Sequence, residues 1–125
     1  MKVAELMRTD LRTISTDATI ADAVDALIDG HVSALPVIDR YGRAVGIVST
    51  REILKAETES RSSSARVLEI MVPWPLTIGP EVDVRVAAQE MLYLNQQRLF
   101  VEYEGALVGV ISQTDVVGAV ANAKV

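Results

Sequence analysis

Apolar side chains recur with helical spacing in two segments of the chain. They fall at i, i+3, i+4, i+7 and i+8 in both, as Ile20, Ala23, Val24, Leu27 and Ile28 and as Val84, Ala87, Ala88, Met91 and Leu92. This spacing predicts two amphipathic helices, each with one buried stripe. Thr19, with Asp22 three residues later, and Asp83 are suitable N-cap residues. The first helix is predicted to end near Gly30, where a left-handed position suits glycine.

Short β-rich runs surround each predicted helix. A brief extended piece precedes each one, Thr13-Ile14 and Thr77-Ile78, and a hairpin with a glycine in its turn follows. The hairpin strands are 35–39 and 44–48 in the first half and 99–103 and 107–111 in the second, and Ser49 and Ser112 then begin further helices. Each half therefore has the predicted order strand, helix, strand, strand, helix.

The two halves are copies of each other. Val3-Ala-Glu-Leu-Met7 matches Val67-Leu-Glu-Ile-Met71, and Gly46-Ile-Val-Ser-Thr-Arg-Glu-Ile53 matches Gly109-Val-Ile-Ser-Gln-Thr-Asp-Val116. Similarity that keeps its order along the whole chain indicates a tandem repeat. We predict a first repeat over 1–57, a Ser-rich linker over 58–65 and a second repeat over 66–125. A repeat of about 60 residues is marginal alone, so we expect the pair to share a core with pseudo-two-fold symmetry.

Composition narrows the class of protein. The 125 residues contain no cysteine, and no run of about 18 uncharged apolar residues and no basic-then-apolar N-terminal segment is present. We therefore expect a cytoplasmic protein with no membrane span and no secretory signal, in a reducing compartment. The net charge of −5 argues against a nucleic-acid partner, because a phosphate backbone requires a basic face.

Catalytic and metal-binding motifs are absent from the sequence. It contains no phosphate-binding or dinucleotide-binding glycine loop, no zinc-protease helix and no nucleophile elbow. The single histidine, His31, follows a helix end and is interpreted as a capping or exposed residue. We expect no catalytic residue, no metal and no enzyme activity.

The repeated serine-to-acid spacing, Ser49 to Glu52 and Ser112 to Asp115, has two interpretations. In the first, each pair is a capping box that satisfies free N–H groups of a helix start. In the second, the helix start binds an anion such as a phosphate, with the serine donating to it and the carboxylate accepting from ribose hydroxyls. A glycine three residues before each serine would let a ligand approach the backbone.

These residues carry a resemblance to a known family. Leu35-Pro-Val-Ile-Asp39, the two glycine-to-acid segments and the repeated Val-to-Met segments resemble a tandem pair of cystathionine-β-synthase (CBS) domains, also called a Bateman module, of the free-standing kind. The resemblance implies a mixed α/β (α+β) fold of two βαββα repeats. It also implies a regulatory homodimer that binds AMP, ADP, ATP or S-adenosylmethionine in clefts between the repeats and relays occupancy to an effector protein. The alternative is an interaction module with empty clefts.

The resemblance also assigns site residues, and the second repeat fits the family pattern best. There Asp115 would hold the ribose, Ser112 and Thr114 the phosphate end, and Thr77 and Ile78 the adenine. Gly109 belongs to the same pattern, and Arg98 is a candidate phosphate cation. All are in the set predicted for the better site.

In the first repeat, an acid of a different length occupies the ribose position. Glu52 is one methylene longer than aspartate, so it either crowds the ribose or folds back as a cap. We therefore predict a weaker or vacant first site, formed by Thr13, Ile14, Pro36, Gly46, Ser49, Arg51 and Glu52. Phe100, which replaces the proline of the first repeat, is interpreted as a core residue or, alternatively, as a residue that walls or blocks a nucleobase pocket. Trp74, between two prolines, is interpreted as packing against the linker or a dimer interface.

Overall fold

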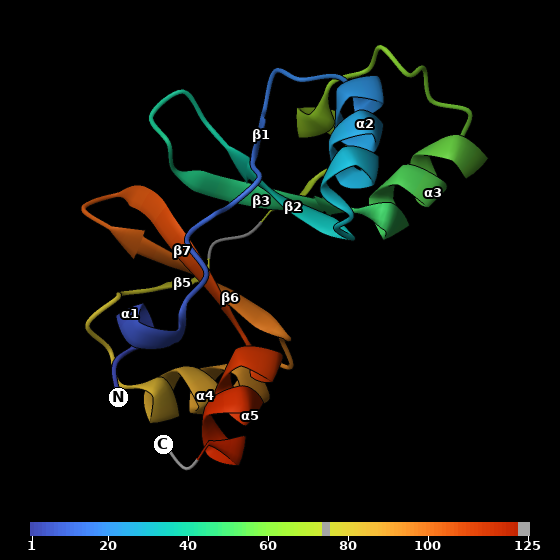
Figure 1. The fold of residues 1–125 in the computed structure, drawn as a ribbon. Coiled ribbons are helices and arrows are strands. Elements are labelled where there is room, and N and C mark those ends of the chain that lie inside the picture. Colours follow the sequence, from blue (N-terminus) through green and yellow to red (C-terminus); the bar gives the residue numbers. More distant parts are fainter. Residues whose placement is uncertain (74–75, 123–125) are drawn as a thin grey trace. The chain divides into compact units, whose positions relative to one another are not determined.

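The computed structural model describes residues 1–73 and 76–122, so the predictions for Trp74 lie outside the described residues. The chain forms two compact units. One contains the described residues between 12 and 73, and the other combines residues 1–11 with those from 76 onward. Each is described separately below, with its elements labelled in Figure 1.

The first unit contains the predicted order of elements. It runs β1 (Ile14–Ser15), α2 (Ile20–Gly30), β2 (Ala34–Ile38), β3 (Ala44–Ser49) and α3 (Thr50–Thr58), followed by a 3-10 turn, η1 (Val67–Glu69), and β4 (Val72–Pro73). The strands form one sheet in the order β1-β2-β3-β4. β1 and β2 are parallel, and the other neighbours are antiparallel. The mixed α/β fold is confirmed, whereas η1 and β4 were not predicted.

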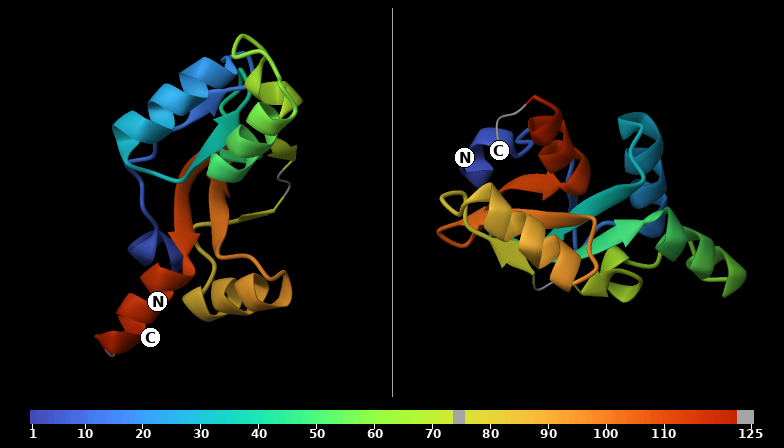
Figure 2. Two further views of the ribbon diagram at one scale, coloured as in Figure 1. Left: turned by 90° about the vertical axis from the view of Figure 1, so that its right-hand side faces the viewer. Right: turned by 90° about the horizontal axis from the view of Figure 1, so that it is seen from below.

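The second unit repeats this arrangement. It contains β5 (Thr77–Ile78), α4 (Val84–Tyr93), β6 (Arg98–Tyr103), β7 (Ala106–Ser112) and α5 (Gln113–Ala121), together with the N-terminal α1 (Val3–Leu6). The sheet order is β5-β6-β7, and an antiparallel bridge from Arg8 to Val110 extends it beyond β7. Figure 2 shows this unit from two further directions. The positive φ angles of Gly42 and Gly105, +80° and +81°, confirm the two predicted hairpin turns.

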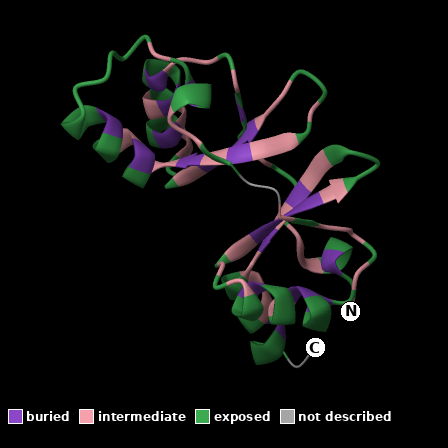
Figure 3. Cartoon of the chain, turned by 180° about the vertical axis from the view of Figure 1, so that it is seen from behind, coloured by how far each residue is buried: buried purple, intermediate pink, exposed green. Residues whose placement is uncertain are grey.

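In each unit, a hydrophobic core lies between the sheet and its helices. Alternate residues of a strand face opposite sides, so only one face of each sheet contributes to this core. Figure 3 shows buried positions along the strands and along the inner faces of the helices. The core of the first unit contains Ile14, Ala23, Leu27, Leu35, Val37, Val48 and Val67. The core of the second contains Val3, Ala87, Met91, Leu99, Val101 and Ile111.

Two details of the predicted helices were wrong. Ile28 and Leu92, the last residues of the predicted buried stripes, are 65% and 76% exposed. They lie at matching places in α2 and α4, each one residue after a buried side chain, Leu27 or Met91, and therefore about 100° around the helix from it. The left-handed residue that ends α2 is His31, with φ of 51°, rather than Gly30. A Cβ on Gly30 would lie 2.5 Å from Cδ of Arg12, so this glycine makes room for that side chain.

Each unit takes its opening segment from the other sequence copy. Lys2 bridges to Asp83, and Arg66 bridges to Thr19, at equivalent positions of the repeat. The amide of Val3 donates to Val82 O, and that of Val67 donates to Ala18 O, at 2.8 and 2.7 Å. The two copies therefore exchange their first segments, and neither compact unit is one copy alone.

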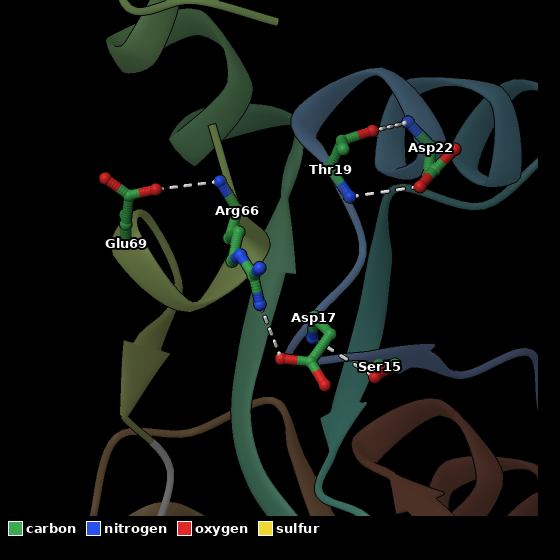
Figure 4. A network of polar contacts seen from close by, with 6 residues as sticks. All are labelled: Ser15, Asp17, Thr19, Asp22, Arg66 and Glu69. Atoms are coloured by element: carbon green, nitrogen blue, oxygen red, sulfur yellow. Dashed lines mark hydrogen bonds and ion pairs between the residues drawn. The ribbon is translucent and has the colours of Figure 1, made fainter. Parts of the chain in front are cut away.

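Polar side chains hold these exchanged segments. Figure 4 shows Arg66 paired with Asp17 at 3.0 Å, beside the capping box of Thr19 and Asp22. In the second unit Lys2 Nζ lies 2.6 Å from Glu81 Oε2, and this hydrogen bond raises the pKa of Lys2. Both pairs are exposed, so they orient the segments more than they stabilise the fold.

Candidate anion and nucleotide site

Ser112 and Asp115 form a capping box at the start of α5. The Ser112 amide donates to Asp115 Oδ2 at 2.9 Å, and the Asp115 amide donates to Ser112 Oγ at 3.1 Å. Both interactions satisfy backbone N–H groups of the first helical turn. Ser112 Oγ acts only as an acceptor here among the described residues, which leaves its own proton available to a ligand.

Ser49 and Glu52 cap α3 with a different pattern of hydrogen bonds. A single oxygen, Glu52 Oε1, accepts from both the Ser49 amide at 2.8 Å and the Ser49 hydroxyl at 2.6 Å. The Ser49 hydroxyl therefore donates its proton to Glu52 rather than to a ligand. Glu52 is also 8% exposed. The longer acid folds back onto its own serine, so capping occurs in both repeats but leaves different groups available.

Asp115 has a second partner that sequence reasoning missed. Arg8 Nε lies 3.2 Å from Asp115 Oδ1, with the arginine side chain 71% exposed and the carboxylate side chain only 9% exposed. At the equivalent position of the first unit, Val72 bridges β3 where Arg8 bridges β7. Among the described residues, no cation pairs with Glu52 in this way. An alignment of the two copies could have indicated this contact, because it places Arg8 opposite the uncharged Val72.

The strand register brings a second arginine beside Ser112. Arg98 of β6 pairs with Ser112 of β7 across the antiparallel ladder. Because Leu99 belongs to the core, Arg98 faces the opposite side of the sheet. In the first unit the residue opposite Ser49 is Ala34. The second repeat thus has two arginines near its serine and acid, at positions that are uncharged in the first.

The remaining residues predicted for the second site are distributed over the same unit. Thr77 pairs with Phe100, two residues from Arg98, and Phe100 is 1% exposed, as expected of a core residue. Ile78 packs against the core cluster, which places its side chain on the other face from Arg98. Thr114 is exposed in the first turn of α5.

A pocket of about 330 Å³ contains only part of the predicted site. Glu90 is the single ionisable residue in its lining, so the pocket is mostly apolar. The lining includes Thr77 and Ile78, but not Ser112, Thr114 or Asp115. Its residues are Leu76, Thr77, Ile78, Gly79, Val82, Val86, Glu90, Leu94 and Leu99. This pocket therefore contains the predicted adenine residues of the second repeat without its predicted phosphate residues.

Both motif glycines accommodate a segment of the protein itself. A Cβ on Gly109 would lie 2.6 Å from Met7 Sδ and 3.0 Å from the Arg8 carbonyl oxygen. A Cβ on Gly46 would meet Met71 and Val72 in the same way, at 2.7 and 2.8 Å. The glycines thus allow the exchanged segments to cross the central strands closely.

The residues predicted for the first site lie on both faces of their sheet. Ile14 is in the core, whereas Pro36 lies between the core residues Leu35 and Val37 and so faces the other side. Thr13 precedes β1 and is exposed. Arg51 is exposed in the first turn of α3, one residue before Glu52.

Three further sequence-based expectations concern His31, membrane-spanning helices and metal-binding clusters. His31 is exposed at the end of α2, in agreement with its interpretation as a capping residue. Within residues 1–73 and 76–122, no helix is long and apolar enough to cross a membrane. The same residues contain no cluster of three or more metal-ligating side chains.

Comparison with known proteins identifies relatives whose similarity extends over most of this chain. An inosine-5′-monophosphate dehydrogenase from Methanocaldococcus jannaschii is 28% identical over 117 residues, which cover 92% of this chain and 23% of that enzyme. This chain therefore spans less than a quarter of the length of that relative. The match concerns one part of a larger enzyme.

Solved structures match over both repeats. The crystal structure of CBSX2 in complex with AMP has a TM-score of 0.85 at 28% identity, covering 99% of this chain and 98% of that one. The CBS domain protein PAE2072 from Pyrobaculum aerophilum, complexed with AMP, has a TM-score of 0.79 at 28% identity, covering 92% and 89%. The sequence profile of the CBS domain matches twice, at residues 3–59 and 67–122. These matches, and the repeated units described above, show that the chain belongs to the CBS-domain family as a tandem pair.

Proposed function

We propose that this CBS pair is a regulatory module that binds an adenosyl nucleotide at its second repeat and relays occupancy to an effector protein in the cytoplasm. AMP, ADP, ATP and S-adenosylmethionine are the candidate ligands. The two AMP-bound relatives support an adenosine ligand. The module is not expected to have catalytic activity, because the serine hydroxyl that donates to a carboxylate, that of Ser49 to Glu52, belongs to a helix cap.

One observation carries this proposal: the two repeats differ in charge where a phosphate would bind. Arg98 lies across from Ser112, and Arg8 contacts Asp115, whereas Ala34 and Val72 occupy the equivalent places in the first unit. Arginine binds phosphate through two parallel N–H groups, so two arginines beside a free serine proton favour an anionic ligand. The first repeat has neither of these arginines. Its own Arg51 is exposed in the first turn of α3, and its serine proton is already bonded to Glu52.

A regulatory module also needs a surface through which the effect of ligand binding reaches another protein chain. The ligand can shift the equilibrium between two conformations of the module only if it binds them with different affinities. Exposed apolar residues occur at matching places on the helices of both units: Ile28 and Leu92 on α2 and α4, and Leu54 and Val117 on α3 and α5. We infer that these helices form the interface of a homodimer, because a repeated apolar surface suits burial against a second copy.

An interaction module that binds no ligand is the second candidate. It is favoured by the capping boxes, which already engage the amides of Ser112 and Asp115. The Gln113 amide is also bonded, to Gln97 O at 2.9 Å. In this case the two acids would act only as helix caps, and the apolar helix surfaces would carry the function.

Titration calorimetry separates the two candidates. We expect saturable binding of at least one of AMP, ADP, ATP and S-adenosylmethionine to the wild-type protein, and loss of that binding in Asp115→Ala. The matched control is Asp83→Ala, which removes an aspartate that also caps a helix of the same unit, at a comparable cost of about 1 kcal/mol in stability. Absence of heat with all four ligands at millimolar concentration would leave the interaction module as the function.

A further inference from the structure

We propose that Arg8 selects the ligand of the second repeat. Its guanidinium contacts the Asp115 carboxylate in this structure, and it moves to the phosphate of a ligand whose ribose takes that carboxylate. The site would then favour 5′-phosphorylated adenosyl ligands over neutral adenosine and over the positively charged sulfonium of S-adenosylmethionine. This inference rests on the proposed function, because it assigns the ligand class of the same site.

The hydrogen bonds of Asp115 create the competition. Its Oδ2 accepts from the Ser112 amide at 2.9 Å, and its Oδ1 accepts from Arg8 Nε at 3.2 Å. A ribose brings two hydroxyl donors to the same carboxylate, and the bond from Ser112 is part of the helix cap. Arg8 is therefore the partner that gives way when the ribose binds.

Burial determines which partner can move. The Asp115 side chain is 9% exposed and is fixed by its place in α5, whereas the Arg8 side chain is 71% exposed. An exposed ion pair contributes little stability, so releasing this one has a small cost. The Arg8 backbone stays in place, because its amide and carbonyl bond Val110 at 2.9 and 3.0 Å. Only the side chain of Arg8 has to change its conformation. Its backbone stays beside β7, close to the start of α5.

The charge of the ligand then decides the outcome. A 5′-phosphate gives the released guanidinium a new anionic partner, with which it can form two hydrogen bonds. Neutral adenosine displaces Arg8 without replacing its partner, and a sulfonium repels it. Arg98, opposite Ser112 in the sheet, is placed to contact the same phosphate. Val72 replaces Arg8 in the first unit, so this selection is specific to the second repeat.

The test compares AMP with adenosine on wild type, Arg8→Ala and Arg85→Ala by calorimetry. In Arg8→Ala we expect AMP to bind about five-fold more weakly and adenosine about two-fold more tightly, so the preference for AMP falls about ten-fold. Arg85→Ala removes an exposed arginine from α4 in the same unit and should leave the preference unchanged. Arg8→Lys should restore part of it, because lysine keeps the charge but not the planar group.

Each outcome has a distinct meaning. If wild type binds AMP and Arg8→Ala keeps the full preference over adenosine, the role of Arg8 is overturned while the proposed function stands. If Arg8→Ala weakens the binding of AMP and of adenosine equally, Arg8 only positions Asp115, and its proposed role in selecting the ligand is again overturned. If wild type binds neither AMP nor adenosine, this inference fails, whereas the proposed function fails only if ADP, ATP and S-adenosylmethionine give no heat either. Thermal unfolding of each variant, expected within about 3 °C of wild type for a surface substitution, shows that the fold is intact.

Discussion

Arg8 and Asp115 are 107 residues apart in the sequence, and their side chains meet at 3.2 Å beside the start of α5. The arginine comes from the opening segment of the first copy and the aspartate from the last helix of the second. The contact therefore exists only because the two copies exchange their opening segments. It adds a chemical difference between two helix starts that share the same spacing from a serine to an acid.

Glu52→Asp should create binding at the first repeat. The shorter acid can no longer reach back to the Ser49 hydroxyl as Glu52 does, so both groups become available. We expect a new site in the Asp115→Ala background, at least ten-fold weaker than the natural one because it lacks the equivalents of Arg8 and Arg98. Calorimetry with AMP measures it. If no heat appears, the acid of the first repeat is only a cap.

Ser112→Ala and Ser49→Ala should separate capping from ligand binding. Ser112→Ala removes a hydroxyl that accepts from the Asp115 amide, and Ser49→Ala removes one that donates to Glu52, so each should lower the free energy of unfolding by about 1 kcal/mol in urea denaturation. Only Ser112→Ala should weaken the binding of AMP, by about five- to ten-fold. The Ser112 hydroxyl has a proton that it can donate to the ligand, whereas the Ser49 hydroxyl already donates its proton to Glu52. Equal AMP affinities in the two variants would contradict the assignment of the phosphate end to Ser112.

Gly109→Ala should destabilise the protein through the exchanged segment. The new methyl would meet Met7 Sδ and the Arg8 carbonyl oxygen, and the backbone atom cannot move away freely. We expect a loss of about 1–3 kcal/mol in the free energy of unfolding. Gly118→Ala is the matched control, since nothing lies within 4 Å of its Cβ position in α5 and alanine there should add about 0.5–1 kcal/mol. A neutral Gly109→Ala would show that the segment does not pack there in solution.

Leu92→Asp should weaken the proposed homodimer. Leu92 is 76% exposed on α4, so the substitution leaves the core of its own unit intact. A carboxylate buried in an apolar interface should raise the dimer dissociation constant about a hundred-fold or more. Sedimentation velocity measures the change. Tyr41→Asp, at an exposed position of the turn between β2 and β3, is the control and should sediment as wild type does. A dimer unaffected by Leu92→Asp would place the interface elsewhere.

Local patterns were sufficient to predict most of the fold. The helix of residues 20–30, the two hairpins and the capping boxes all depend on residues a few positions apart, as in Thr19 with Asp22 and Ser112 with Asp115. Ile28 and Leu92 show the limit of periodicity. Helical spacing identifies an apolar stripe, but it cannot show how much of the width of that stripe the rest of the unit covers.

The sequence by itself determined the tandem repeat, the order of elements in each copy, the helix caps and the CBS resemblance, because these follow from local spacing and from similarity between the copies. Only the tertiary structure decided that opening segments exchange, that Gly46 and Gly109 make room for them, and that Arg8 reaches Asp115. These features depend on which distant segment fills the space beside a strand. Packing of the whole chain, rather than the composition of any segment, determines that choice.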